Sequence, residues 1–173
     1  MSQQTKNTMK KIYLEKIVLN MGVGKSGDAI EVAKNALQQI SGKKPSSRNA
    51  KETLRDWGVR KGEPIGVAVT VRNDEAKALL KRLFEAKGNE VKAKSFDNFG
   101  NYSFGMKEHI DIPGVKYDPQ IGILGLGISL TLSRPGHNIR FRSKHKSKIG
   151  KSHIITKKEA QDFLTEEFGI QVV

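Results

Sequence analysis

Residues 134–151 hold the densest group of side chains in this chain that could bind a charged partner. The segment contains seven Lys or Arg residues and no acid. In an extended chain alternate residues lie on one side, so the cations from 140 to 148 could follow a phosphate backbone. An arm that is solvated and has no partner is the alternative. The residues expected to bind phosphate in this basic arm are Arg134, Arg140, Arg142, Lys144, Lys146, Lys148 and Lys151.

A second candidate site is the segment 53–63, which has the sequence of a loop and contains the only Trp of the chain, Trp57. Cations and an aromatic ring on one loop can stack on exposed nucleotides and hold phosphate groups. The alternative is that Trp57 packs into the core, which is its commoner position, although the flanking Asp56 and Gly58 favour exposure. The residues expected to bind are Arg55, Trp57, Arg60 and Lys61.

A third, weaker candidate is the segment 43–52, which is basic, rich in hydrogen-bond donors and free of acids until Glu52. Hydroxyl, amide and cationic groups all suit contacts to phosphate and to the 2′-hydroxyl of RNA. A solvated edge strand would have the same composition. The donors in this segment include Lys43, Lys44, Ser46 and Arg48.

Motifs typical of enzymes are incomplete. Gly24, Lys25 and Ser26 follow an apolar segment as in a phosphate-binding loop, but that loop requires Gly five positions earlier, where this chain has Leu19. The glycines near residue 125 lack the spacing of a dinucleotide-binding turn. No two of the four His residues have metal-ligand spacing. We therefore expect no enzyme activity, no cofactor, no metal and no small-molecule substrate.

Composition favours a polyanionic partner. The chain has 173 residues, with 31 Lys and Arg against 18 Asp and Glu, for a net charge of +13. Such a charge attracts nucleic acid, because each phosphate that is neutralised releases counterions. The longest apolar run, Ile121 to Leu132, is shorter than the roughly 20 residues that cross a membrane. The absence of Cys excludes disulfides.

The periodicity of apolar residues predicts the elements that must position these cations. Strands are expected over 12–21 and 64–72, and a buried, Gly-rich strand over 121–133. Helices are expected over 28–41, after a cap at Asn73, and after a capping box of Thr156 and Glu159. These elements predict an α+β fold, a mainly antiparallel sheet with helices on one face and a basic extended arm. Residues 1–10 are expected to be a disordered tail, and 11–173 a single domain.

In the predicted sheet, alternate residues of two strands point away from the helices. That face would carry Lys16, Asn20, Thr70 and Arg72. It would be polar and basic, and it would be exposed to solvent unless a partner binds there.

Several long stretches of the chain resemble the ribosomal protein L-five family. They occur in the order of the family, cover most of residues 12–132 and are far longer than generic motifs. They read KIVLNMGVGKSGD, ISGKKPSSRNAK, WGVRKGEPIGVAVTVR, SFDNFGNYSFGMKEHID and VKYDPQIGILGLGISL. The arm that begins with Arg-Pro-Gly and the stretch KSHIITKKEA resemble the archaeal and eukaryotic branch.

The resemblance implies a non-catalytic protein of the large ribosomal subunit, in the cytoplasm, that binds 5S rRNA in the central protuberance. It implies 5S contacts at Lys16, Asn20, Lys43 and Thr70, although bacterial members have Gln where this chain has Lys43. It also implies that the loop 53–63 reaches the tRNA in the peptidyl site and that the arm contacts 23S rRNA. Other large-subunit proteins would be neighbours. A free-standing RNA-binding module or RNA chaperone is the alternative.

Overall fold

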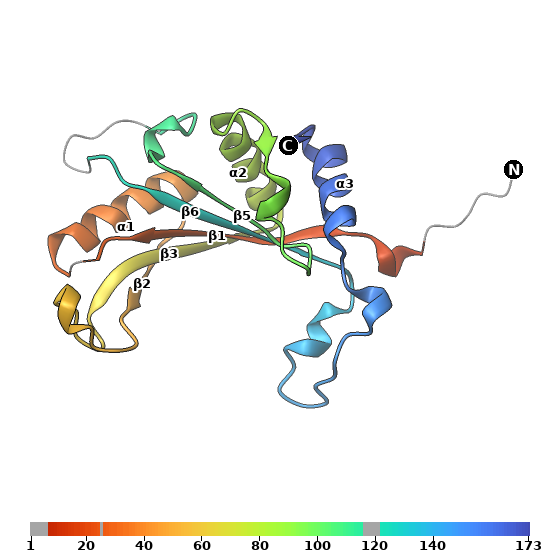
Figure 1. Ribbon diagram of the computed structural model, residues 1–173, viewed down its shortest axis with the longest axis horizontal. Coiled ribbons are helices and arrows are strands. Elements are labelled where there is room, and N and C mark those ends of the chain that lie inside the picture. The colour runs from red at the N-terminus through yellow and green to blue at the C-terminus, as the bar shows by residue number, and fades with distance from the viewer. Residues whose placement is uncertain (1–6, 25, 116–121) are drawn as a thin grey trace, which may run out of the picture.

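Within the residues that the structure describes, 7–24, 26–115 and 122–173, the computed structural model shows a five-stranded antiparallel sheet and three α-helices. The strand order is β2-β3-β1-β6-β5, and the helices lie on one face of the sheet (Figure 1). The predicted α+β class is confirmed. The strands are β1 (Tyr13–Gly22), β2 (Ser46–Asn49), β3 (Pro64–Arg72), β5 (Tyr102–Met106) and β6 (Leu126–Ser133), and the helices are α1 (Asp28–Ser41), α2 (Asn73–Ala86) and α3 (Lys157–Phe168).

The core lies between the sheet and the helices. On the sheet side it is formed by every second residue of each strand. Ile17, Leu19 and Met21 point from β1 into this core and are almost inaccessible to solvent, as predicted. Burial of each such side chain stabilises the fold by about 1.5–3 kcal/mol. The helix side chains that cover the sheet include Ile30, Ala33, Leu37 and Ile40 of α1, and Ala76, Leu79, Leu80 and Leu83 of α2.

Of the two helix caps predicted from the sequence, one is confirmed and one is wrong. Gly42 ends α1 with a left-handed conformation, φ 67°, which glycine adopts without strain. Thr156 and Glu159 form the predicted capping box at the start of α3. The predicted cap at Asn73 is wrong: α2 begins at Asn73 itself with φ 61°, and no side chain caps it.

Short elements join the main ones. A small parallel sheet of β4 (Glu90–Val91) and β7 (Gln171–Val172) fixes the C-terminal end beside the segment that follows α2. Phe84 of α2 stacks on Phe104 of β5, with ring centroids 5.8 Å apart, and meets Phe168 of α3 edge-on. The short 3-10 helices are Thr8–Lys10, Arg55–Trp57, Ala93–Ser95, His109–Asp111, His137–Arg140 and Lys151–His153.

Two predicted segments differ from the structure. The strand expected over 121–133 begins only at Leu126, residue 121 being outside the described residues, and it is buried on one face only, because Gly127 and Ser129 are exposed. Of the predicted disordered tail, residues 1–6 lie outside the described residues. Residues 8–10 instead form a 3-10 turn, which the side chain of Asn7 caps.

Candidate nucleic-acid interface

The face of the sheet opposite the helices carries most of the residues predicted to bind 5S rRNA. Asn20 of β1 lies opposite Ala68 of β3, which in turn lies opposite Ser46 of β2. Because alternate residues of a strand share a side, this register places further polar residues on the same side. The predicted residues on this face are Lys16, Asn20, Ser46, Arg48 and Thr70.

The other half of this face was missed by the sequence reasoning. Ser129 of β6 lies opposite Val18 of β1 and Ser103 of β5, and the Ser103 hydroxyl donates a hydrogen bond to Ser129 Oγ at 3.2 Å. Gly127 lies opposite Asn20. A sequence pattern that marks this half was present: within residues 126–133, every second residue is Gly, Ser or Thr. We define the open face as Lys16, Val18, Asn20, Ser46, Arg48, Ala68, Thr70, Arg72, Ser103, Gly105, Gly127, Ser129 and Thr131.

Two of the three cations on the open face, Lys16 and Arg72, lie at the end where β1 changes register, and Arg48 lies at the other end. The irregularity falls between Leu14 and Lys16, and Glu15 sits in it. The Glu15 carboxylate lies 3.9 Å from the Lys16 ammonium and 3.8 Å from the Arg72 guanidinium. One carboxylate thus faces two cations, and this end of the face stays net positive.

Lys43 and Lys44 do not lie on the open face. Lys43 follows the cap of α1 and forms an ion pair with Glu75 in the first turn of α2. Both side chains are substantially exposed, so the pair is weak. Lys44 is exposed just before β2 begins. These two lysines form a separate cationic site at the edge of the helical layer.

The loop 53–63 is a compact hairpin that presents Trp57 to solvent. Leu54 and Val59 exchange backbone hydrogen bonds of 2.9 and 3.1 Å, and the turn between them is the 3-10 helix Arg55–Trp57, closed by Gly58 with φ 64°. The Trp57 side chain is 77% exposed. This exposure confirms the solvent-facing alternative and excludes the core position. Arg55, Arg60 and Lys61 lie on the same hairpin.

Glu63 ties this hairpin to the rest of the protein. Its carboxylate accepts hydrogen bonds from the Arg60 backbone N–H and from the Ser26 hydroxyl, both at 2.9 Å. The hydrogen bond from Arg60 and, to a smaller extent, that from Ser26 hold the pKa of Glu63 below its usual range. These hydrogen bonds anchor the base of the hairpin that carries Trp57 and its neighbouring cations.

The basic arm folds back on itself, so the prediction of an extended chain is wrong. It contains the 3-10 turn His137–Arg140, a left-handed residue at His145 with φ 54°, and a hydrogen bond from the Ser147 N–H to the Ile139 carbonyl. Figure 1 shows this arm as a loop on the side of the sheet away from the helices. Most of its cations are exposed, including Arg140, Arg142, Lys144, Lys146, Lys148 and Lys151.

Arg134 does not fit the prediction of an exposed cation in this arm. It is 4% exposed, and its guanidinium donates a hydrogen bond of 2.7 Å to the Glu159 carboxylate in the first turn of α3. Burial opposes the charge of Glu159, but hydrogen bonds from Thr156 and Arg134 outweigh it and hold the pKa of Glu159 below its usual range. Arg134 therefore joins the arm to α3.

The described residues contain no group of three or more His, Asp or Glu side chains that could hold a metal ion. In the same part of the chain, no helix is long and apolar enough to cross a membrane. The polar surfaces are instead an uncovered sheet face, a hairpin with an exposed aromatic and a basic arm. Polar and cationic groups beside an exposed aromatic ring are the groups by which proteins contact nucleic acids, so these surfaces are the candidate interface.

Comparison with known families identifies the class and then the family. Residues 7–60 match the family described as ribosomal protein L5, and residues 64–172 match the family that describes the C-terminus of the same ribosomal protein. The chain is therefore a ribosomal protein and not an enzyme. It belongs to the ribosomal protein L5 family. The boundary between the two matches falls at residues 61–63, inside the loop 53–63, and the five-stranded sheet combines strands from both.

Similar proteins come from archaea and match over nearly their full length. The chain is 76% identical over 172 residues to the large ribosomal subunit protein uL5 of Nitrosopumilus maritimus, a match that covers 99% of both chains. It is 67% identical to the uL5 protein of Cenarchaeum symbiosum, over 95% of this chain and 98% of the relative. It is 49% identical to that of Pyrobaculum aerophilum, over 95% and 92%.

Proposed function

We propose that this chain is a structural constituent of the large ribosomal subunit that binds 5S rRNA through its open face and anchors it in the central protuberance. The observation that carries the proposal is the open face itself. Most of its side chains are small or polar, and the basic arm meets it only at one end. The cations Lys16 and Arg72 lie at that end, and Arg48 lies at the other. Small side chains let an RNA backbone approach closely, and hydroxyl and amide groups can bind phosphate and 2′-hydroxyl groups.

The residues predicted to bind 5S rRNA then divide into two groups. Asn20 and Thr70 lie centrally on the open face, where both can form hydrogen bonds, and Lys16, Ser46 and Arg48 flank them. Lys43 and Lys44 lie at the edge and would hold a phosphate of a neighbouring strand. At this edge a phosphate would compete with Glu75 for the Lys43 ammonium. The net contribution of Lys43 to RNA affinity is therefore small.

The open face is tested by the double variant Asn20→Ala and Thr70→Ala. Each lost hydrogen bond costs about 1 kcal/mol, so affinity for 5S rRNA should fall about 30-fold at constant salt. The measurement is equilibrium binding of purified 5S rRNA with a tRNA of similar size as competitor. Neither residue belongs to the buried core, so the free energy of unfolding should change little.

A matched control removes the same two side-chain types from the helical side. Asn35 of α1 and Thr165 of α3 are both exposed, and their double replacement by Ala should leave 5S binding unchanged. Equal 5S affinity of the open-face variant and this control would show that the open face is not the binding site.

The hairpin 53–63 is proposed to contact the tRNA in the peptidyl site. Trp57 is suited to rest on an exposed base, and the cations of the hairpin are suited to hold phosphate. Because the tRNA leaves at every cycle, the contact must be modest, and stacking on one base contributes about 1–3 kcal/mol.

Trp57→Ala should weaken retention of peptidyl-site tRNA by reconstituted ribosomes about fivefold or more and leave 5S binding unchanged. Emission of the only Trp should be red-shifted and quenched by iodide in the free protein, and protected once tRNA is bound. Tyr13→Ala, which removes an exposed aromatic ring elsewhere, is the control for tRNA retention. Unchanged quenching on tRNA binding would argue against the contact.

The basic arm is proposed to bind 23S rRNA through its exposed cations, with Arg134 excluded because it is buried against α3. Residues 11–173 would act as one domain on the cytoplasmic ribosome, next to other large-subunit proteins. The arm and the open face lie on the same side of the sheet (Figure 1), so one continuous RNA surface could meet both.

A further inference from the structure

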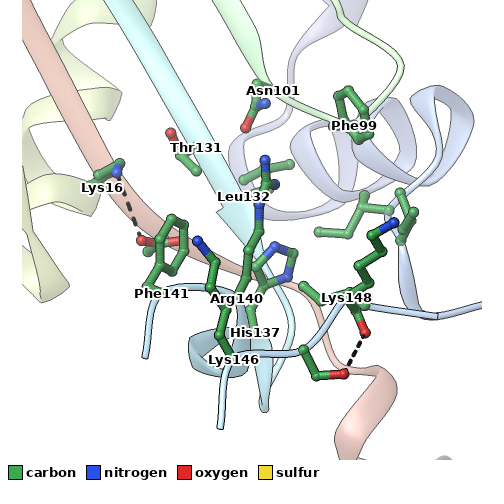
Figure 2. Close-up of a pocket in the computed structure, with 15 residues that line it drawn as sticks. Lys16, Phe99, Asn101, Thr131, Leu132, His137, Arg140, Phe141, Lys146 and Lys148 are labelled. Atoms are coloured by element: carbon green, nitrogen blue, oxygen red, sulfur yellow. Dashed lines mark hydrogen bonds and ion pairs between the residues drawn. The ribbon is translucent and has the colours of Figure 1, made fainter. Parts of the chain in front are cut away.

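A cavity of about 590 Å³ lies where the charged end of the open face meets the basic arm. Figure 2 shows the side chains of Lys16, Arg140, Phe141 and Lys146 around it. Its size is within the range of small-molecule sites, about 300–1,000 Å³. It is too large for a single phosphate contact and has the dimensions for a nucleotide.

The walls of the cavity are mainly apolar and include two aromatic rings that face solvent. Phe141 is 64% exposed and Phe99 is 57% exposed, and both line the cavity with Leu132 and Ile155. Exposed aromatic rings are costly in a free protein and are typical of sites that stack on unpaired bases. The Arg140 guanidinium lies 5.9 Å from the centre of the Phe141 ring, so this ring is positioned beside a cation.

The wall that carries Phe99 is fixed by a tight turn. The Asp97 carboxylate accepts hydrogen bonds from the backbone N–H groups of Phe99 and Asn101, at 2.9 and 2.7 Å. At Gly100, where φ is 77°, a Cβ atom would come within 2.6 Å of the Ile155 side chain. The turn therefore needs glycine, and Phe99 is held at the cavity before any ligand arrives.

The polar groups of the cavity match a nucleotide rather than a bare anion. Lys16, Arg140, Lys146 and Lys148 supply positive charge, but the Glu15 carboxylate also lines the cavity and would repel an isolated phosphate. A carboxylate can accept hydrogen bonds from the amino and imino groups of a base. Guanine offers two parallel N–H donors, whereas uracil offers one N–H between two carbonyl groups.

His137 adds an unsatisfied polar atom to the same wall. Its Nδ1 is buried and has no hydrogen-bond partner among the described residues. Burial lowers the pKa of His137, an effect that Arg140 and His153 reinforce and Glu15 opposes.

We propose that this cavity binds one unstacked guanosine nucleotide of ribosomal RNA, an inference that rests on the proposed RNA-binding function. The base stacks on Phe141 with its donor edge at Glu15, and Lys146 and Lys148 hold the flanking phosphates. This site lies beyond the central contacts of the open face and depends on the folded-back shape of the arm.

The test compares two single-stranded RNA hexanucleotides, one with a single guanosine among uridines and one with uridine alone. The full-length protein should bind the guanosine hexamer about fivefold more tightly or better, because guanine stacks over a larger area than uracil and presents two N–H donors to Glu15. Methyl signals of Ile149, Ile154 and Ile155, which line the cavity, should shift in NMR spectra. Phe141→Ala should abolish the preference for guanosine, and because Phe141 is exposed the variant should fold.

The matched control is Arg142→Gln with Lys144→Gln, two cations of the same arm that do not line the cavity. This variant should bind both hexamers more weakly and keep their affinity ratio. Guanosine 5′-monophosphate should shift the same methyl signals at higher concentration; tighter binding of the free nucleotide than of the hexamer would overturn the assignment to RNA. Absence of a guanosine preference, or its survival in Phe141→Ala, would overturn the site. Binding of 5S rRNA through Asn20 and Thr70 is measured separately, so either proposal can fail alone.

Discussion

Replacing Glu159 with Ala is expected to lower the free energy of unfolding by about 3 kcal/mol. The Glu159 carboxylate has two structural roles at the start of α3. It completes the capping box with Thr156, and it is paired with Arg134, whose side chain is 5% exposed. Its loss removes the cap and leaves a buried guanidinium without a counter-charge, which is the costlier effect. Because the Glu159 side chain is 42% exposed, the expected loss in free energy of unfolding lies at the lower end of the range for broken buried ion pairs.

The measurement is urea denaturation at neutral pH, with Glu166→Ala as control. Glu166 is an exposed carboxylate of the same helix, and its replacement should change the free energy of unfolding by less than about 0.5 kcal/mol. In a double-mutant cycle, Arg134→Met should recover part of the loss caused by Glu159→Ala, because no unpaired charge remains. A loss in Glu159→Ala no larger than in Glu166→Ala would show that the pair does not stabilise the protein.

The effect of Glu159 should also depend on pH. The pKa of this carboxyl is lower in the folded protein than in an unfolded chain, so its contribution is present above the ordinary carboxyl range. It is lost as the pH falls through the lowered pKa, when the group is protonated in both states. The difference in stability between the parent and Glu159→Ala should therefore shrink in acid.

The strands and helices that pack against the core were predictable because burial imposes a period on the sequence. β1 and β3 alternate, and α1 repeats apolar residues at helical spacing, so both signals are local and strong. In β6 the alternation was present, but the high glycine content was interpreted as burial on both faces. Gly127 is instead an exposed residue of the open face.

The positions of individual cations depend on tertiary contacts that no local pattern contains. Arg134 begins a basic run and has the composition of an RNA contact, yet it pairs with Glu159 of a later helix. Lys43, which follows α1, likewise pairs with Glu75 of α2. Alternation along 140–148 predicted one charged side, but a turn near His145 reverses the chain.

The cavity next to the arm could not be predicted either, because it depends on tertiary contacts. Its walls come from β1, from the turn at Asp97, from β6 and from the folded-back arm, segments that are far apart in the sequence. The part of the open face on β1 and β3 could be predicted, because alternation within each strand decides which residues lie on it. The cavity requires the return path of the arm, which rests on weak turns and on few backbone hydrogen bonds.

Removal of four charges from the arm is expected to give the largest change in RNA binding. In the variant Arg140→Gln, Arg142→Gln, Lys144→Gln and Lys146→Gln, each lost phosphate contact should remove about 0.7–0.9 from the slope of log affinity against log salt concentration. The slope for purified large-subunit rRNA should therefore decrease by about 3 if all four side chains bind phosphate. The affinity loss should be greatest at low salt and should diminish as salt rises.

The control removes the same number of charges from the opposite side of the protein, at Lys77, Lys81, Lys87 and Lys92, all of which are exposed. Because these lysines lie on or just after α2, away from the open face, their loss changes the net charge equally but should remove no phosphate contact. The slope should then stay near that of the parent, while long-range attraction weakens slightly. Equal decreases in slope for both variants would mean that the arm contributes only to net charge and does not bind the RNA backbone directly.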